Sequence, residues 1–188
     1  MLKGPSVVGL GLTFLVAGAV GWTATTWATP RVIMSAALER IEAEAGGPNQ
    51  MIKAPPVDEE SREVVRPSPD LLYSLCAYDV SESDILVKVG STPGYWSISF
   101  YDEATNNFDV RGYGGGSEDL RIFTISKGAM ARQVVRSPSN RGLALIRRRV
   151  GNREELEAAI DAQHDDDCGP LPNRAHAYGS SARQPFPL

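Results

Sequence analysis

The sequence predicts a mainly β, α+β protein, in which an N-terminal transmembrane helix precedes an antiparallel β-sandwich or partly closed barrel with one C-terminal helix. Three observations predict this class. Residues 4–30 hold no charged side chain, apolar residues alternate with a period of two after Asp70, and helical spacing returns only after Asn152. The chain has 188 residues, 42% of them hydrophobic, and a net charge of −4. That composition excludes a wholly disordered chain and argues against nucleic acid as a partner.

The first predicted unit, residues 1–30, is a transmembrane anchor. The apolar run 6–28 is long enough to cross a bilayer core of about 30 Å at about 1.5 Å per residue. Lys3 precedes the run, and Trp22 and Trp27 near its far end are typical of a membrane interface. A cleaved secretory signal is the alternative interpretation, but two bulky tryptophans in the cleavage region favour an uncleaved anchor.

Small residues recur every four positions within this span, at Thr13, Ala17, Gly21 and Thr25. Small side chains on one helix face let a second helix approach closely, so this is a possible helix-packing face. The same residues are common in any single span, and a partner helix is therefore a hypothesis.

Residues 31–69 are predicted to form an amphipathic helix and a proline-rich linker. Thr29 and Pro30 are a favourable helix start, a capping hydroxyl followed by proline at the first helical position. Helical spacing of apolar residues then continues as far as Ala45, and Gly46 with Gly47 ends it. The prolines of residues 48–69 favour an extended segment because proline lacks an amide donor.

Residues 70–168 are predicted to form the β domain with its terminal helix. Trp96, Ile98 and Phe100 alternate with serines, as in a strand with one dry and one polar face. We expect seven strands, at residues 71–80, 85–89, 95–101, 107–111, 120–126, 131–136 and 143–150, separated by turn sequences. Asn152 is positioned to cap a helix that ends at residues 165–170, and residues 169–188 are expected to be a disordered tail.

Patterns that suggest catalysis or cofactor binding are weak. The glycine-rich segment 112–117 lacks the following helix and the Lys-Ser or Lys-Thr pair of a phosphate loop. His164 and Cys168 have the spacing of metal ligands, but the sequence breaks the helix there, so no metal site is predicted. Asp70, Asp79, Asp102 and Asp109 lie beside turns or strand ends, where aspartate ordinarily caps or turns the chain. No cofactor and no catalytic residue is predicted.

Three consecutive arginines, Arg147, Arg148 and Arg149, close the last predicted strand. In a strand, Arg147 and Arg149 point one way and Arg148 the other. A solvated edge that discourages aggregation is the favoured interpretation, and an anionic partner such as a phosphate or a lipid headgroup is the alternative.

The two cysteines, Cys76 and Cys168, are compatible with one disulfide in an oxidising compartment, and equally with two buried free thiols. A short N-terminal tail before a single span usually stays in the cytoplasm. We therefore expect a single-pass protein of the inner (cytoplasmic) membrane, with its soluble domain in the periplasm.

Several segments resemble the bacterial domain-of-unknown-function family 1254. Its hallmarks are an Arg-Pro-x-Pro-Asp-x-x-Tyr-Ser segment, a Tyr-Asp strand end, and a Gly-Tyr-Trp-Ser-aliphatic strand followed by Asn-Phe. The residues that match the first two are Arg66, Asp70, Tyr73, Ser74, Tyr78 and Asp79. The third hallmark is matched by residues 94–98 and by Asn107 with Phe108.

The resemblance implies a mainly β domain of a short membrane-anchored subtype, often found with a companion from the related family 1214. It supplies no catalytic residues. From charge alone, we expect a buried ion pair between Arg66 and Asp70.

Two functions are compatible with the sequence. The first is a noncatalytic, membrane-anchored envelope protein whose β domain binds a companion protein. The second is an envelope enzyme or small-molecule binder with an aromatic and carboxylate pocket, formed from Tyr73, Tyr95, Trp96 or Tyr101 with Asp70 or Asp102.

Overall fold

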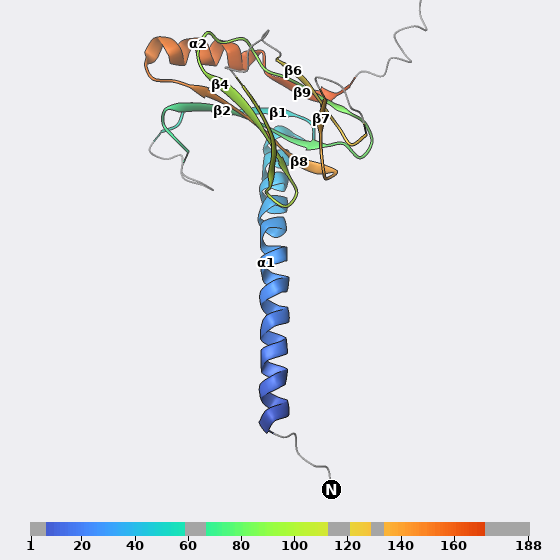
Figure 1. Cartoon of the computed structure of the whole chain (residues 1–188). Coiled ribbons are helices and arrows are strands. Elements are labelled where there is room, and N and C mark those ends of the chain that lie inside the picture. The colour runs from blue at the N-terminus through green and yellow to red at the C-terminus, as the bar shows by residue number, and fades with distance from the viewer. Residues whose placement is uncertain (1–6, 59–66, 113–120, 129–133, 172–188) are drawn as a thin grey trace, which may run out of the picture.

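The structure is a computed structural model that describes residues 7–58, 67–112, 121–128 and 134–171. A long helix, α1 (Val7–Ala45), leads into a domain of two sheets and a short helix (Figure 1). In the described ranges, α1 is the one helix long and apolar enough to cross a membrane, judged by its length and composition.

The strands that the structure describes form two sheets. The first, sheet A, has the order β1 (Met51–Lys53), β2 (Leu71–Asp79), β8 (Arg141–Arg149), β4 (Trp96–Asp102) and β5 (Asn107–Gly112), all antiparallel. The second, sheet B, has the order β7 (Val134–Arg136), β6 (Ile122–Ser126), β3 (Ile85–Lys88) and β9 (Asp167–Pro170). The predicted mainly β, α+β fold with a sandwich-like core is confirmed, and these sheets do not close into a barrel.

The main core lies between the two sheets because every second side chain of each strand points inward. Sheet A contributes Ile98, Phe100 and Ile146, and sheet B contributes Ile85 and Ile125, all fully shielded from solvent. Phe100 and Phe123 meet edge to face across the core, with ring centroids 6.0 Å apart. Helix α2 (Arg153–His164) follows β8, and Asn152 caps it by accepting from the Glu155 amide, as predicted.

A second, smaller core fixes α1 to the opposite face of sheet A. Met34 and Leu38 are buried against Ala77, although most of α1 is exposed. Arg141 Nη2 donates to Glu42 Oε1 at 2.7 Å, and this hydrogen bond raises the pKa of Arg141. The domain is therefore packed onto the C-terminal part of α1.

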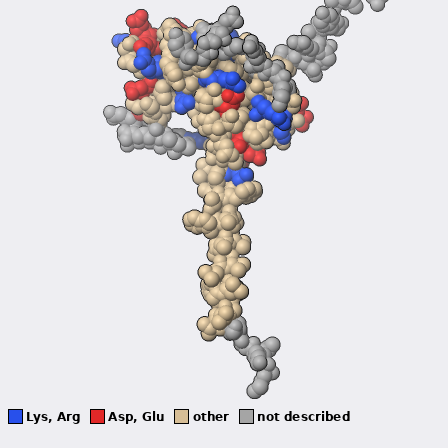
Figure 2. Space-filling view, viewed as in Figure 1, with Lys and Arg blue, Asp and Glu red and all other residues tan. Residues whose placement is uncertain are grey.

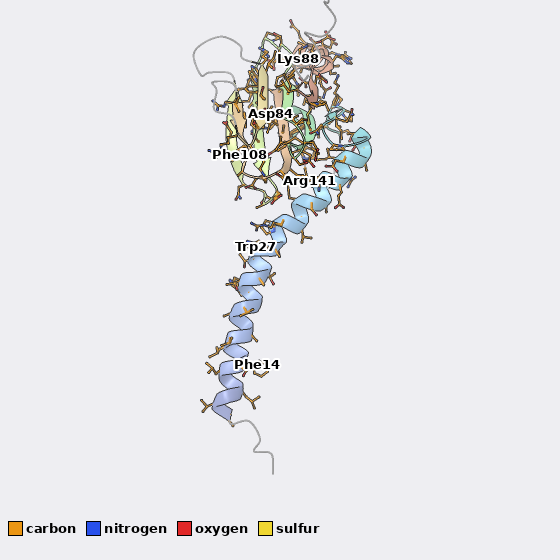
Figure 3. The ribbon with its side chains drawn as sticks, turned by 90° about the vertical axis from the view of Figure 1, so that its right-hand side faces the viewer. Phe14, Trp27, Asp84, Lys88, Phe108 and Arg141 are labelled. Carbon is orange, nitrogen blue, oxygen red and sulfur yellow. A yellow bond between two sulfur atoms is a disulfide. The ribbon has the colours of Figure 1, made fainter. Side chains whose placement is uncertain are left out.

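The predicted helix start at Thr29 and Pro30 is wrong, because α1 continues through both residues. Thr29 Oγ1 donates back to the Thr25 carbonyl, an interaction inside the helix and not a cap. Proline costs a helix one backbone hydrogen bond and commonly bends it. Figure 3 shows α1 as one ribbon that changes direction above Trp27.

Other predicted boundaries also differ from the structure. The proline-rich segment contains β1, which pairs with β2, and the expected tail begins inside β9, which pairs with β3. Strand β7 lies parallel to β6, not antiparallel, since the spacing of apolar residues does not specify strand direction. Residues 172–188 of the expected tail lie outside the described residues.

Candidate functional site

Four residues of the family motif, Tyr73, Ser74, Tyr78 and Asp79, lie on β2 and do not gather into one site. Ser74 and Tyr78 are buried on the core side of sheet A, whereas Tyr73 and Asp79 are half-buried on the other side. Tyr73 accepts a hydrogen bond at its hydroxyl from the Ser68 amide at 3.0 Å. Alternation along the strand therefore divides the motif between two environments.

The ion pair expected between Arg66 and Asp70 is not buried on the Asp70 side. Asp70 is exposed, and its carbonyl accepts from the Val150 amide at 2.9 Å. Arg66 lies outside the described residues.

Among the described residues, Arg148 on β8 and Asp166 after α2 form a fully buried ion pair. Arg148 Nη1 donates to Asp166 Oδ2 at 2.8 Å, and Arg148 Nη2 donates to Asp166 Oδ1 at 2.5 Å. The side chains are 1% and 0% exposed. This two-pronged geometry is the strongest that arginine and carboxylate form.

Three further residues complete what we call the Arg148 centre, defined as Ser74, Gly90, Arg121, Arg148 and Asp166. Ser74 Oγ donates to Asp166 Oδ2 at 2.6 Å, and the Gly90 amide donates to Asp166 Oδ1 at 2.8 Å. The Gly90 carbonyl accepts from Arg121 Nη1 at 2.9 Å and from Arg148 Nη2 at 3.2 Å. The Asp166 carboxylate thus accepts four hydrogen bonds, two of them from the Arg148 guanidinium, as a buried polar group requires.

Glycine is required at position 90 by close approach. A Cβ there would overlap the carbonyl of Ala162 on α2 and lie 3.0 Å from the Asp165 Cβ. The Arg148 centre thus draws together sheet A, the residues that follow β3, and the end of α2. Because the Ser74, Arg148 and Asp166 side chains are buried and bonded to one another, they hold these elements together.

Sequence reasoning missed this centre, although one signal was present. Arg148 shares the face of β8 with Ala144 and Ile146, both fully buried. A cation on a dry face requires a counter-ion, because an unpaired buried charge is very costly. The residues around Asp166 predict only the end of a helix, because its partner Arg148 lies 18 positions away in the sequence.

Tyr78 forms a second buried polar group at the other end of β2. Its hydroxyl donates to the Tyr101 carbonyl at 3.1 Å and shares a hydrogen bond of 3.0 Å with Ser137 Oγ. Burial raises the pKa of Tyr78 to about 12. Its ring lies across Gly142, where a Cβ would overlap the tyrosine hydroxyl.

The arginine run does not form a sheet edge, so that interpretation is wrong. Strand β8 is the middle strand of sheet A, between β2 and β4. Arg147 lies on the face opposite Arg148, as predicted from alternation, and its Nη2 donates to Ser99 Oγ at 2.8 Å. Arg149 is exposed and contacts Glu155 at 3.2 Å.

The aromatic residues considered for a small-molecule pocket lie in different places. Trp96 is buried in the main core beneath the Arg121 guanidinium, whereas Tyr101 packs in the smaller core near α1. Tyr95 is 48% exposed, and Tyr73 lies on the outer face of sheet A. The structure therefore does not bring these side chains into one pocket.

The aspartates considered as catalytic residues have local roles. Asp102 Oδ1 accepts from the amides of Ala104 and Asn106, which shapes the turn between β4 and β5. Asp79 Oδ1 accepts from the Ser81 amide at 2.9 Å, and Asp109 pairs with Arg111 at 2.8 Å.

Cys76 on β2 and Cys168 on β9 form a disulfide, with their Cα atoms 6.4 Å apart. The bond joins sheet A to sheet B, and Cys168 lies on a strand, not on the helix where the sequence suggested it.

His164 is exposed at the end of α2, where its carbonyl accepts from Lys53 Nζ. Within the described residues, no three His, Cys, Asp or Glu side chains are grouped as metal ligands. Most of the glycine-rich segment, residues 113–117, lies outside those residues.

The solved structures to which this chain is similar include the following two. The VPA0106 protein from Vibrio parahaemolyticus is 18% identical, with a TM-score of 0.49, covering 65% of this chain and 33% of that one. A putative uncharacterised protein from Burkholderia cenocepacia is 14% identical, also with a TM-score of 0.49, covering 88% of this chain and 44% of that one. The present chain thus spans less than half the length of either protein. No curated protein matches the sequence.

A family model described as "Protein of unknown function (DUF1254)" matches residues 48–170. The matched region begins just after α1 and contains both sheets, both cysteines and the whole Arg148 centre. The match covers well over half of the sequence, and the chain therefore belongs to the DUF1254 family.

Proposed function

We propose that this protein is a noncatalytic, single-pass protein of the inner membrane, with its β domain in the periplasm, where it binds a companion membrane protein. The observation that carries the proposal is α1. Its first two-thirds expose large apolar side chains, among them Val7 at 85%, Phe14 at 77% and Trp22 at 77%. Apolar surface on that scale needs a cover, and a lipid bilayer is the cover that suits a single apolar helix.

The charge distribution supports an anchor with a defined end. The lower part of α1 is free of charged atoms on the face seen in Figure 2. Arg31 is the first cation of α1 and lies over the Trp27 ring, 3.9 Å from its centroid. Arginine and tryptophan side by side are typical of the headgroup region, where a charged tip and an amphipathic ring are both stable.

The disulfide supports the periplasmic side. A buried bond between Cys76 and Cys168 persists in an oxidising compartment and is rare in the cytoplasm. The smaller core around Leu38 packs the β domain directly onto the C-terminal part of α1, which supports a domain held close to its membrane anchor.

A companion is the finer part of the proposal. Thr13, Ala17 and Gly21 offer a face on which a second helix can pack closely. The family resemblance suggests a membrane protein of family 1214 as that companion.

Topology is tested first, on the full chain in native membranes. A reporter fused after Leu188 is expected to be active only if it is periplasmic, and the protein is expected to stay in the membrane pellet after an alkaline wash. Activity of a cytoplasmic reporter, or release by the wash, would contradict the proposal.

The companion is tested by affinity purification in mild detergent. We expect one membrane protein to co-purify in a constant ratio, to be lost with Ala17→Leu, and to be retained with Ala19→Leu. Residues two apart on a helix lie about 200° apart, so the second variant makes the same change on the opposite face. Purification of this chain alone, or equal loss in both variants, would count against a helix-mediated companion.

A further inference from the structure

We propose that α1 continues its contact with the membrane beyond Pro30, through an exposed face formed by Val32, Ile33 and Ala36 that lies in the lipid headgroup layer. This contact holds the β domain against the bilayer surface. The inference rests on the proposed function, because it takes α1 to be a membrane anchor. It goes further, since it assigns a second lipid-contacting surface to the part of the helix that carries the domain.

The part of α1 that packs on the β domain has two unlike faces. Met34 and Leu38 are buried against the domain. On the other side, Val32 is 64% exposed and Ile33 is 58% exposed. Ala36 is also exposed, and residues three or four apart are neighbours on a helix surface, so these three residues form what we call the juxtamembrane patch. An apolar face opposite the packed face indicates a second apolar contact.

The juxtamembrane patch continues the exposed surface of the predicted span. Steps of three or four residues lead from Trp22 through residues 25 and 29 to Val32 and Ala36, so they follow one side of the helix. Trp22 is 77% exposed. Thr29 Oγ1 donates to the Thr25 carbonyl at 2.8 Å, so the hydroxyl next to the patch is bonded within the helix. The surface therefore runs from the span to Ala36 without a charged side chain on this side.

Arg31 does not interrupt this surface. It precedes Val32, and consecutive helical residues point about 100° apart. Its guanidinium is turned back over the Trp27 ring, 3.9 Å from the centroid, and its Nη1 donates to the Trp27 carbonyl at 2.7 Å. The charge is thus held at the level of Trp27, a residue type of the headgroup boundary. Glu39 is the first acidic residue of α1, so the apolar surface ends just beyond the patch.

The bend near Pro30 brings the patch toward the membrane. Residues 7–27 already cover about 30 Å at about 1.5 Å per residue, so Ile33 would stand about 9 Å higher on a straight, upright helix. The headgroup layer is about 5–8 Å thick on each side of the bilayer core. Figure 3 shows α1 leaning over above Trp27, with the β domain above the leaning part. The side away from the domain, which carries the patch, therefore faces the membrane.

The size and position of the patch favour lipid over protein as its cover. Stable protein interfaces typically bury about 1,200–2,000 Å², which three aliphatic side chains cannot supply. A bilayer that surrounds the span is already present at this height. A helix with more apolar surface than the bilayer thickness needs commonly tilts or kinks, and Pro30 provides the kink.

The experiment uses the full chain with its disulfide intact, as single copies in nanodiscs of phosphatidylcholine and phosphatidylglycerol. A nitroxide label is attached to Ile33→Cys or to Ala43→Cys, and its collisions with oxygen and with a water-soluble nickel complex are measured. Oxygen concentrates in the bilayer and the nickel complex in water. We expect a severalfold higher oxygen-to-nickel ratio at Ile33→Cys than at Ala43→Cys, an exposed position further along the same helix.

A third labelled variant, Phe14→Cys, separates this inference from the proposed function. Phe14 is 77% exposed within the predicted span. A high ratio at Phe14→Cys with a water-like ratio at Ile33→Cys overturns this inference alone and leaves the anchor standing. A water-like ratio at Phe14→Cys contradicts the anchor and this inference with it. A label at Ile33→Cys that neither reagent reaches shows that protein covers the patch, which also overturns the proposal.

A charge placed in the patch provides an independent test. Val32→Glu is combined with the label at Ile33→Cys and is expected to lower the oxygen-to-nickel ratio severalfold, because a carboxylate is unstable in contact with apolar lipid. Ala43→Glu is the matched control, since it adds the same charge to the same helix beyond the patch, and it is expected to leave the ratio unchanged. Equal ratios in the two variants overturn the proposal.

Discussion

Arg148 and Asp166 form an ion pair that is shielded from solvent on both sides, with two hydrogen bonds of 2.8 and 2.5 Å between them. The pair links the middle strand of sheet A to the residues after α2. Such a pair adds little net stability, because the desolvation of two charges offsets most of their attraction. Removing one partner is a different matter, since the other charge then stays buried alone.

We therefore expect Arg148→Met to lower the free energy of unfolding by about 3–5 kcal/mol, measured by urea unfolding of the full chain in detergent. Arg153→Met is the matched control, because its contact with Glu157 is exposed and such pairs contribute little. The double variant Arg148→Met with Asp166→Leu is expected to recover part of the loss. Equal stabilities of Arg148→Met and Arg153→Met would contradict a buried pair.

The disulfide gives the second prediction. Cys76 and Cys168 are 92 positions apart, so their bond restricts a large part of the unfolded chain. Replacing both by alanine is expected to cost about 2–5 kcal/mol of unfolding free energy. Peptide maps of protein from native membranes, with and without reductant, provide the direct measurement. Identical maps would show that the bond is absent in the cell.

The alternating pattern made the long strands predictable. Trp96, Ile98 and Phe100 point into the core as expected, since a period of two on a half-buried sheet leaves little freedom. Strands β1 and β9 were not predictable in this way. Met51–Lys53 is too short to show a period, and Asp167–Pro170 contains glycine and proline, so both exist because of pairing with distant strands.

The polar interior was harder to predict than the fold. Ser74 was selected by family resemblance, but its partner Asp166 was not, because hydrogen bonds between residues 92 positions apart leave no local pattern. The environment of Arg147 also leaves no local pattern, because it depends on which strands flank β8. The alternation along the strand predicts the face of the sheet on which each arginine lies. Only the strand order shows that β8 is a middle strand and not an edge strand.

The contact between α1 and sheet A gives the third prediction. Leu38 is 1% exposed, whereas Ile33 on the same helix is 58% exposed. Leu38→Ala is expected to cost about 2–5 kcal/mol of the free energy that holds this part of α1 on the sheet, because it leaves a cavity. Hydrogen exchange measured by mass spectrometry should show faster exchange of residues 35–45. Ile33→Ala is the control and should leave that exchange unchanged; equal acceleration by both variants would contradict packing through Leu38.

The buried hydroxyl of Tyr78 gives a prediction for alkaline pH. Burial raises its pKa from the ordinary value of 10.0 to about 12, so the folded state retains this proton when the unfolded chain has lost it. Stability from this difference is fully present below pH 10.0 and is lost as the pH rises to about 12, a change of about 2–3 kcal/mol. Tyr78→Phe cannot titrate, so the stability difference between wild type and this variant should decrease by that amount over the same interval.

Urea unfolding at a series of pH values measures this difference in stability, with Tyr95→Phe as the control because Tyr95 is 48% exposed. A difference between wild type and Tyr78→Phe that stays constant from pH 10.0 to about 12 would mean that the hydroxyl is accessible to solvent in the folded protein.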